Sequence, residues 1–487
     1  MLKEKALKGV RWTSLSAVIS VGIQTLQLMV VTRFLSPRDF GLMALASVVI
    51  GFSQLFIDLG VSNAIIHRQD ISHPQLSSLF WFNVIMGSTV FALVVLAAPA
   101  ICRFYDQPAL RPVLYLVSFS FILQSFEQQF YALLKKELHF DAIAKRDIFA
   151  KVVGMFVAIV CAMRGWGVYA LVWAQLSYAL VSVLLLTSAG LKHHRPGLHF
   201  RWSDIKPFLH FGLYQTGEGI CNYFNSQIDV LVVGRILGVT ELGIYNVAKT
   251  IAFRPFQMIN PVVTQVSFPV MAKAQNDLPR LKAIYLKGLN YLCSVNFPVY
   301  VFLIAFADPL VRVLFGAKWG PAAPILEILS LYTMTRSIFN PIGSLMLARG
   351  MVRKTFWWNV AMLCLVPVAV FVGARFSLWA VGLALTLLQI LLILPAWRWL
   401  IYPGCQATLG EYLGALLRPL LVALVAGLAL YACSLANLPH PLAKLALGGV
   451  AMIGLAGLVN RWLNRPFYGE VSLMVRDAAG KLKIRFN

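Results

Sequence analysis

Ionisable side chains occur inside several long apolar stretches, and they are the residues of this sequence best suited to bind or move a charged species. An acid or base at the centre of a membrane helix costs about 2.5–3.5 kcal/mol. Such a residue therefore normally faces a protein interior or a water-filled cavity. The ionisable residues in apolar stretches are Asp58, Glu127, Lys151, Glu218, Asp229, Lys249, Arg254, Glu327 and Arg336. For each one taken singly, an internal ion pair explains its presence as well as a binding function does.

These side chains and their polar neighbours fall into groups with different chemistry. The carboxylates suited to bind a proton or Na⁺ are Asp58, Glu218 and Asp229. The cations suited to pair with an anionic headgroup are Lys249, Arg254 and Arg336. The neutral residues able to hydrogen-bond a polar cargo are Gln215, Asn222, Asn225, Ser226, Gln227, Gln257 and Asn260.

The sequence lacks the obvious signatures of enzymes. It contains no GxxxxGKS/T phosphate loop, no HExxH motif and no GxSxG elbow. His193, His194 and His199 lie close together, but no carboxylate or cysteine completes a metal site, which favours a solvated linker. The seven cysteines are widely separated and are typical of small packing residues. We therefore expect no enzymatic function, no cofactor and no metal.

The composition indicates a polytopic membrane protein. Hydrophobic residues make up 59% of the 487 residues and charged residues only 13%, whereas soluble domains carry about a quarter charged residues. The net charge of +23 fits the excess of Lys and Arg that cytoplasmic loops carry. Nucleic-acid binding is not expected, because no nucleic-acid-binding motif accompanies the charge.

Apolar runs of about 20 residues predict about fourteen membrane helices and an all-α fold. The predicted spans are 12–35, 39–66, 77–104, 109–134, 142–163, 166–190, 207–237, 240–272, 281–306, 321–348, 353–374, 377–400, 412–435 and 441–463. Assigning the loops alternately places most Lys and Arg residues, including Lys145 and Arg146, on the side of the N-terminus. Both termini are therefore predicted to be cytoplasmic.

An internal duplication organises these spans. Residues 30–46 and 232–248 align without a gap, with about six identities in about seventeen positions, and Asp39 aligns with Glu241. Polar residues precede both segments at helical spacing. The two polar stripes are Thr13, Ser16, Ser20, Gln24 and Gln27, and Gln215, Glu218, Asn222, Ser226 and Asp229. The copies lie an even number of helices apart, so the repeat is predicted to be parallel, with a twofold axis along the membrane normal.

The repeat predicts a domain organisation. Residues 1–190 form a first lobe of six helices, 191–206 a cytoplasmic linker and 207–400 a second lobe of six helices. Residues 401–463 add two helices, and 464–487 form a cytoplasmic tail. The polar stripes would be costly to expose to lipid, so a hydrophilic cavity between the lobes is expected. Pro255, Pro261 and Pro269 favour bends in the span that follows the second stripe.

Several of these segments also resemble a known family. They are Trp12–Thr13, Arg33–Gly41, Phe56–Gly60, Ile228–Arg235, Gly243–Ala248, Asn260–Pro269 and Lys318–Pro324. Together they resemble the colanic acid exporter and O-antigen flippase branch of the polysaccharide flippases, over roughly residues 5–400. That branch is part of the multidrug/oligosaccharidyl-lipid/polysaccharide superfamily. The resemblance implies two six-helix lobes, alternating access, and transport of a polyprenyl-pyrophosphate-linked oligosaccharide to the outer leaflet of a bacterial inner membrane.

Two alternatives stay open at this point. A cation-coupled multidrug exporter of the same superfamily would use H⁺ or Na⁺ at Asp58, Glu218 or Asp229. A membrane scaffold would assemble with a polysaccharide polymerase complex and transport nothing. If the flippase hypothesis holds, the neutral polar residues contact the sugar, the three cations contact the pyrophosphate, and the polyprenyl tail stays among membrane lipids.

Overall fold

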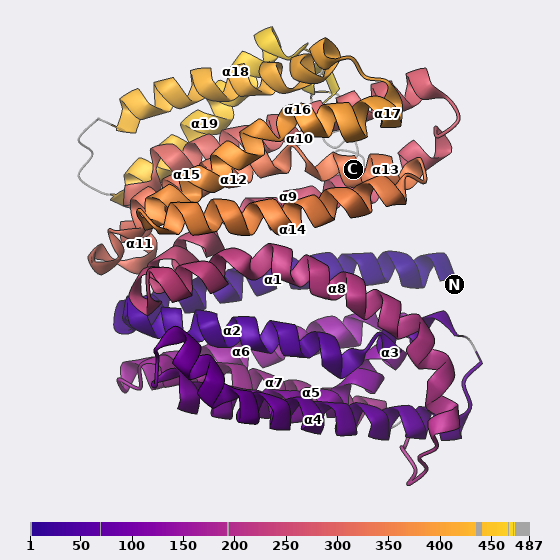
Figure 1. Ribbon diagram of the computed structural model, residues 1–487. Coiled ribbons are helices and arrows are strands. Elements are labelled where there is room, and N and C mark those ends of the chain that lie inside the picture. Colours follow the sequence, from indigo (N-terminus) through magenta and orange to yellow (C-terminus); the bar gives the residue numbers. More distant parts are fainter. Residues whose placement is uncertain are drawn as a thin grey trace, which may run out of the picture. The chain divides into compact units, whose positions relative to one another are not determined.

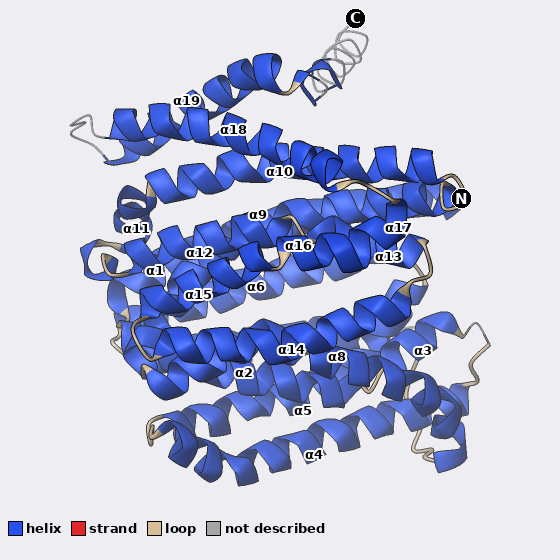
Figure 2. Ribbon diagram, turned by 45° about the horizontal axis from the view of Figure 1, so that its top comes forward, coloured by secondary structure: helices blue, strands red, loops and turns tan. Residues whose placement is uncertain are grey.

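The computed structural model describes residues 2–68, 70–191, 194–434, 441–465, 467–470 and 472. Some side chains within these ranges, those of Gln215 and Glu218 among them, lie outside the described residues. Every regular element in the described ranges is a helix (Figure 2). The all-α fold is therefore confirmed. The chain divides into two compact units, residues 1–243 and 244–487.

The first unit is a bundle of eight helices. They are α1 (Leu2–Phe34), α2 (Pro37–Asp58), α3 (Val61–His67), α4 (His73–Tyr105), α5 (Leu110–Lys136), α6 (Phe140–Met163), α7 (Val168–Gly190) and α8 (Trp202–Ile236). Helix α6 packs against α1 and α7, and α5 packs against α4 and α7. Helix α8 crosses α2, α3 and α4 (Figure 1). Asp39 binds the N-terminal turn of α2 and also accepts a hydrogen bond of 3.0 Å from the backbone N–H of Val168, the first residue of α7.

The second unit surrounds α10. Its helices are α9 (Val239–Lys273, whose first turn belongs to the first unit), α10 (Leu278–Ala305), α11 (Ala307–Phe315), η1 (Ala317–Trp319), α12 (Ala322–Ser337), α13 (Asn340–Ala348), α14 (Val352–Ala374), α15 (Leu378–Leu391), α16 (Ile393–Ala396), η2 (Trp397–Ile401), α17 (Tyr402–Cys405), α18 (Leu409–Ser434) and α19 (Pro441–Leu463). Helix α10 packs against α12 and α18, and α15 packs against α12 and α14. Tyr285 and Tyr300 of α10 and Tyr412 of α18 are fully buried in this core.

Both units contain helices that are long and apolar enough to span a membrane. Within the described ranges, nine helical segments are long and apolar enough to cross a membrane. The other predicted spans correspond to α5, α6, α8, α9 and the pair α12–α13. These helices are more polar because they carry most of the ionisable residues singled out above. The chain is a multi-pass membrane protein with roughly the predicted number of spans.

Three predicted spans are not single regular helices, so that part of their prediction was wrong. The span 377–400 divides into α15, α16 and η2. The span 39–66 breaks between α2 and α3, where Leu59 and Gly60 adopt left-handed backbone angles with φ of 38° and 72°. The Asp58 carboxylate accepts a 2.9 Å hydrogen bond from the backbone N–H of Ser62 and so binds the start of α3. The span 321–348 breaks after Ser337. Pro341 has no N–H to donate to the carbonyl of Ser337, which ends the helical ladder there.

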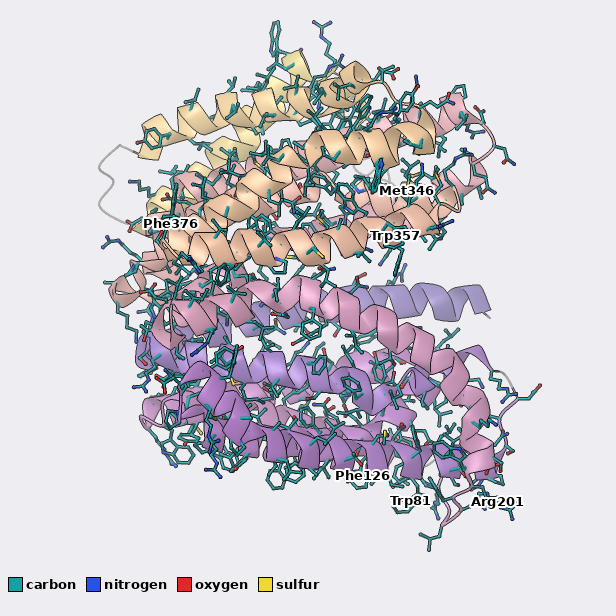
Figure 3. The ribbon with its side chains drawn as sticks, viewed as in Figure 1. Trp81, Phe126, Arg201, Met346, Trp357 and Phe376 are labelled. Atoms are coloured by element: carbon teal, nitrogen blue, oxygen red, sulfur yellow. The ribbon has the colours of Figure 1, made fainter. Side chains whose placement is uncertain are left out.

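The connection between α7 and α8 is hydrogen-bonded to α4. Trp81 Nε1 donates a 2.9 Å hydrogen bond to the carbonyl of Gly197, and Ser78 Oγ donates one of 2.9 Å to Asp204. Trp81 and Arg201 lie at the same end of the first unit (Figure 3). His194 is buried beside His73, with ring centroids 4.5 Å apart, and this burial lowers the pKa of His194. Among the described residues, no group of three His, Cys, Asp or Glu side chains is placed to hold a metal.

The two duplicated corners contact each other through glycine. A Cβ atom on Gly41 would lie 1.8 Å from the carbonyl oxygen of Val239, and a Cβ atom on Gly243 would lie 1.8 Å from that of Pro37. In the repeat alignment Gly41 corresponds to Gly243 and Pro37 to Val239. The contact is thus reciprocal, as a local twofold axis between the corners requires. All four residues belong to the first unit. The division into lobes 1–190 and 207–400 stays a prediction.

Candidate functional site

A charged network lies among α1, α6 and α7 of the first unit. Lys151 Nζ donates hydrogen bonds of 2.6 Å to Asp147 Oδ2 and 2.9 Å to Ser20 Oγ. The Tyr178 hydroxyl donates one of 2.9 Å to Asp147 Oδ1. The side chains of Lys151 and Asp147 are 22% and 23% exposed, so the pair is only partly shielded from solvent. The Ser20 hydroxyl also donates a hydrogen bond of 3.3 Å to Asp147 Oδ2. The Asp147 carboxylate therefore contacts one cation and two hydroxyl groups, which come from three helices.

A second ion pair lies beside this network and joins α5, α6 and α7. Arg146 Nη2 is 3.7 Å from Glu127 Oε2, and the two side chains are 10% and 14% exposed. The Ser182 hydroxyl donates a hydrogen bond to the same carboxylate. Arg146 was counted from the sequence among the basic residues on the side of the N-terminus, and in the structure it lies within α6 and pairs inside the bundle. Glu127 and Lys151 thus each lie in an internal ion pair, as one of the two interpretations from the sequence predicted.

The network opens onto a polar pocket of about 450 Å³. Gln24 and Gln27 of α1, Lys151 of α6, and Gln175 and Tyr178 of α7 contribute its polar lining. Gln24 and Gln27 belong to the first predicted polar stripe. That stripe therefore faces polar groups of its own unit. A hydrophilic cavity between the lobes stays a prediction.

The second stripe lies on α8. Tyr223 packs against α2, where its hydroxyl donates a 2.7 Å hydrogen bond to the carbonyl of Val48. Asn222 and Ser226 are exposed, whereas Asp229 is 7% exposed. The predicted residues Gln215 and Glu218 lie outside the described side chains.

Two further predicted residues of α8 are half-buried. They are Asn225 and Gln227. The side-chain oxygen of Asn225 is buried and has no hydrogen-bond partner among the described residues.

Cations and aromatic rings form a cluster between α9 and α12 of the second unit. Lys249 Nζ lies 5.6 Å from the ring centroid of Phe253, and Arg336 Cζ lies 5.5 Å from the same ring. Arg336 also lies 5.6 Å from the ring of Phe256 and donates a 3.2 Å hydrogen bond to the hydroxyl of Tyr332. Aromatic faces hold cations by electrostatic attraction. We define Lys249, Phe253, Phe256, Tyr332 and Arg336 as the cation–aromatic cluster.

The remaining predicted residues of the second unit lie on α9 at different depths. Arg254 is half-buried, and its spacing of five residues from Lys249 turns it off the Lys249 face of the helix. Gln257 is exposed, whereas Asn260 is buried and accepts a 3.0 Å hydrogen bond from Asn296. The structure therefore joins Lys249 with Arg336 around one ring, and it places Arg254, Gln257 and Asn260 elsewhere on α9. Their roles in substrate binding stay predictions.

Asp147, Arg146 and Tyr178 were not among the candidate site residues predicted from the sequence. Asp147 and Lys151 have the i, i+4 acid–base spacing of a helical ion pair, and both fall within the predicted span 142–163. That spacing was the available signal for Asp147. No sequence signal points to Tyr178, because its contact with Asp147 depends on how α6 packs against α7.

Cysteine labelling tests the polar face of α8. Cysteines at 222 and 226 should react readily with a charged thiol reagent, because both positions are exposed on the polar stripe. A cysteine at 223 should be protected, because Tyr223 packs against α2. Leu96 on α4 is 76% exposed and apolar, so a cysteine there should lie in lipid and resist the reagent. Protection at both 222 and 226 would contradict a water-accessible face.

Known proteins resemble this chain over most of its length. A family model described as "Polysaccharide biosynthesis protein" matches residues 30–324. The lipopolysaccharide biosynthesis protein WzxC of Escherichia coli strain K12 is 33% identical over 425 residues, 87% of this chain and 86% of that protein. The teichuronic acid biosynthesis protein TuaB of Bacillus subtilis strain 168 is 30% identical over 445 residues, 90% of each chain.

A solved structure shares the fold. The lipid II flippase MurJ in an inward closed conformation has a TM-score of 0.71 and 14% identity, with 93% of this chain and 99% of that chain covered. The resemblance to polysaccharide flippases inferred from the sequence is confirmed. Because the family model matches more than half of the chain and one relative is 33% identical over most of both proteins, the chain belongs to the polysaccharide biosynthesis protein family.

Proposed function

We propose that this chain is a flippase that moves a polyprenyl-pyrophosphate-linked oligosaccharide from the cytoplasmic to the outer leaflet of a bacterial inner membrane. Family membership supports a role in polysaccharide biosynthesis, and the fold shared with a lipid II flippase supports movement of a lipid-linked cargo. The protein is a transporter that works by alternating access and performs no covalent chemistry. Both termini face the cytoplasm, as the distribution of Lys and Arg favours.

The cation–aromatic cluster is the observation that carries the headgroup assignment. Lys249 and Arg336 come from different helices and both lie within 6 Å of the centroid of one ring, that of Phe253. Two neighbouring cations suit a pyrophosphate, which presents several acceptor oxygens, and Arg can bind two of them at once. Arg254 contributes a third positive charge from another face of α9. The neutral side chains Asn222, Asn225 and Gln257 are suited to hydrogen-bond the sugar.

The membrane potential can drive this transport. A pyrophosphate headgroup carries about two negative charges, and an inside-negative potential favours its outward movement. At about 100 mV this contributes on the order of 4–5 kcal/mol, at about 2.3 kcal/mol for each charge. The cations then need only extract the headgroup from the inner leaflet and release it on the other side. Coupling to H⁺ or Na⁺ at Asp58, Glu218 or Asp229 is the alternative driving force.

The function is tested by measuring which lipid-linked intermediate accumulates in cells that lack the chain. A flippase predicts that lipid-linked oligosaccharide accumulates in the inner leaflet while other components of the pathway still assemble. A scaffold of a polymerase complex predicts that assembly fails instead. A cation-coupled drug exporter predicts unchanged lipid-linked intermediates and greater sensitivity to toxic compounds.

Alanine substitutions of the cations should reduce export in the complemented cells. We expect Lys249→Ala, Arg254→Ala and Arg336→Ala each to lower export severalfold. Each removes a positive charge that lowers the free-energy cost of extracting the headgroup from the inner leaflet. Arg254→Lys should retain more activity than Arg254→Ala. Gly22→Ala serves as a control, since a Cβ there meets nothing within 4 Å. Normal export by all three alanine variants at normal protein level would show that the headgroup binds elsewhere.

A further inference from the structure

A cationic pocket lies at one end of the second unit, separate from the cation–aromatic cluster. It has a volume of about 640 Å³ and is lined by Arg353, Lys354 and Trp357 of α14 and by Arg398, Trp399 and Pro403 at the end of the α15–α17 segment. Trp357 lies near the start of α14 (Val352–Ala374), and Phe376 lies just past its other end (Figure 3). The pocket is therefore at the N-terminal end of this helix and not in its middle.

A local departure from α-helical geometry positions half of this pocket. Residues Trp397–Ile401 form a π-helical turn, in which the N–H of Tyr402 bonds to the carbonyl of Trp397. Pro403 cannot donate to the carbonyl of Trp399, so the regular ladder cannot continue there. The indole N–H of Trp397 donates a 2.9 Å hydrogen bond to the carbonyl of Ala407 and anchors the turn. Arg398 and Trp399 are left exposed on its outer side. π-Helical turns are often found at functional sites.

Several basic residues of the second unit have partners within the chain. Lys282 pairs with Glu411 at 2.7 Å, Lys287 pairs with Glu470, and Arg349 donates a 2.8 Å hydrogen bond to the carbonyl of Gln275. Within the described residues, Arg353, Lys354 and Arg398 make no ion pair with a carboxylate. Three positive charges therefore converge on one pocket without an acidic partner from this part of the chain. An anion from outside the chain is their natural counter-ion.

The surroundings of the pocket are those of a membrane interface. Trp357 and Trp399 are 53% and 58% exposed, and tryptophan is enriched where the headgroups meet the hydrocarbon. Leu394 and Leu391 lie four and seven residues before Arg398 on the α15–α17 segment. They are 56% and 72% exposed, so an apolar surface lies on the same segment as the charged pocket. A charged headgroup site that continues into exposed leucines matches a lipid better than a small soluble anion.

We propose that this pocket binds the phosphate headgroup of an anionic glycerophospholipid, with its acyl chains along Leu394 and Leu391. The predicted topology places the start of α14 and the end of the α15–α17 segment on the cytoplasmic side. The lipid would therefore come from the inner leaflet. Basic pockets between membrane helices on that side bind such headgroups. The site is distinct from the cargo site, and its occupancy ties α14 to the α15–α17 segment.

Binding of dioleoyl phosphatidylglycerol to the purified full chain in neutral detergent tests the proposal by native mass spectrometry. The variant Arg353→Gln/Lys354→Gln/Arg398→Gln should bind the lipid on the order of 100-fold more weakly, at about fivefold for each lost charge. The variant Arg353→Lys/Arg398→Lys should retain most of the binding. A control with the same loss of charge, Arg103→Gln/Arg164→Gln/Arg375→Gln, removes exposed cations elsewhere and should bind like the wild type.

Competition experiments distinguish the sources of phosphate. Inorganic phosphate at millimolar concentration should not displace the lipid, and dioleoyl phosphatidylcholine should not compete. Displacement by inorganic phosphate would show a small-anion site and overturn the proposal. Preferential displacement by polyprenyl pyrophosphate would assign the pocket to the cargo and would also overturn it. Equal weakening by the control variant would show a nonspecific charge effect. None of these readouts depends on export, so failure here leaves the proposed function untouched.

Discussion

Replacing Asp147 by asparagine should lower export at least tenfold. The substitution leaves the Lys151 ammonium with Ser20 as its remaining partner in the network, beside the pocket that Gln24 and Gln27 line. Loss of one partner of an ion pair lowers the free energy of unfolding by about 1 kcal/mol for an exposed pair and by about 3–5 kcal/mol for a buried one. With side chains 22% and 23% exposed, this pair falls between those limits. Export in complemented cells, normalised to the amount of inserted protein, is the measurement.

A double variant separates a role in folding from a role in transport. Asp147→Asn/Lys151→Met removes both charges and should restore the amount of folded protein, because no charge is left without its partner. Export should stay low if the charged network participates in the transport cycle. Full recovery of export would show that the pair is only structural. Asp308→Asn is a suitable control, because Asp308 and Arg312 have the same i, i+4 spacing but are 52% and 57% exposed.

Alanine at Gly41 or at Gly243 should strongly reduce the stability of the protein. Each added Cβ would lie 1.8 Å from a backbone oxygen, which cannot move aside as the end of a flexible side chain can. Overpacking of ordinary core sites costs about 1–3 kcal/mol, and a clash with backbone belongs at or above the top of that range. The first turns of α2 and α9 must separate to accept either change. Thermal unfolding of the purified protein, followed by size-exclusion chromatography, gives the loss.

The reciprocal geometry gives this second prediction a further test. Since the two contacts are equivalent, Gly41→Ala and Gly243→Ala should destabilise to a similar degree. Once one change has separated the corners, the second should cost less, so the double variant should lose less stability than the sum of the single ones. Gly22→Ala should leave stability unchanged or slightly raise it, because alanine favours helix more than glycine does. Stability equal to wild type in both corner variants would refute the close contact.

Apolar length and helical spacing are local properties, and they were sufficient for much of the fold. The spans, their approximate number and the alignment of residues 30–46 with 232–248 follow from the order of residues alone. Together the segments that resemble the flippases identified the family, because the combination of several motifs is more specific than any one of them. Breaks at Leu59–Gly60 and after Ser337 were missed, because an apolar run hides a left-handed turn and the effect of one proline.

Pairing between distant helices was decided only by the tertiary structure. Glu127 could have met any cation of a neighbouring span, and its pairing with Arg146 depends on the packing of α5 against α6. The convergence of Arg353 and Arg398 likewise depends on a π-helical turn, which places two exposed residues of one segment beside the start of another helix. An ionisable residue in an apolar run shows that a partner is needed, because an unpaired charge is costly there. Which partner it finds is determined by distances between helices far apart in the sequence.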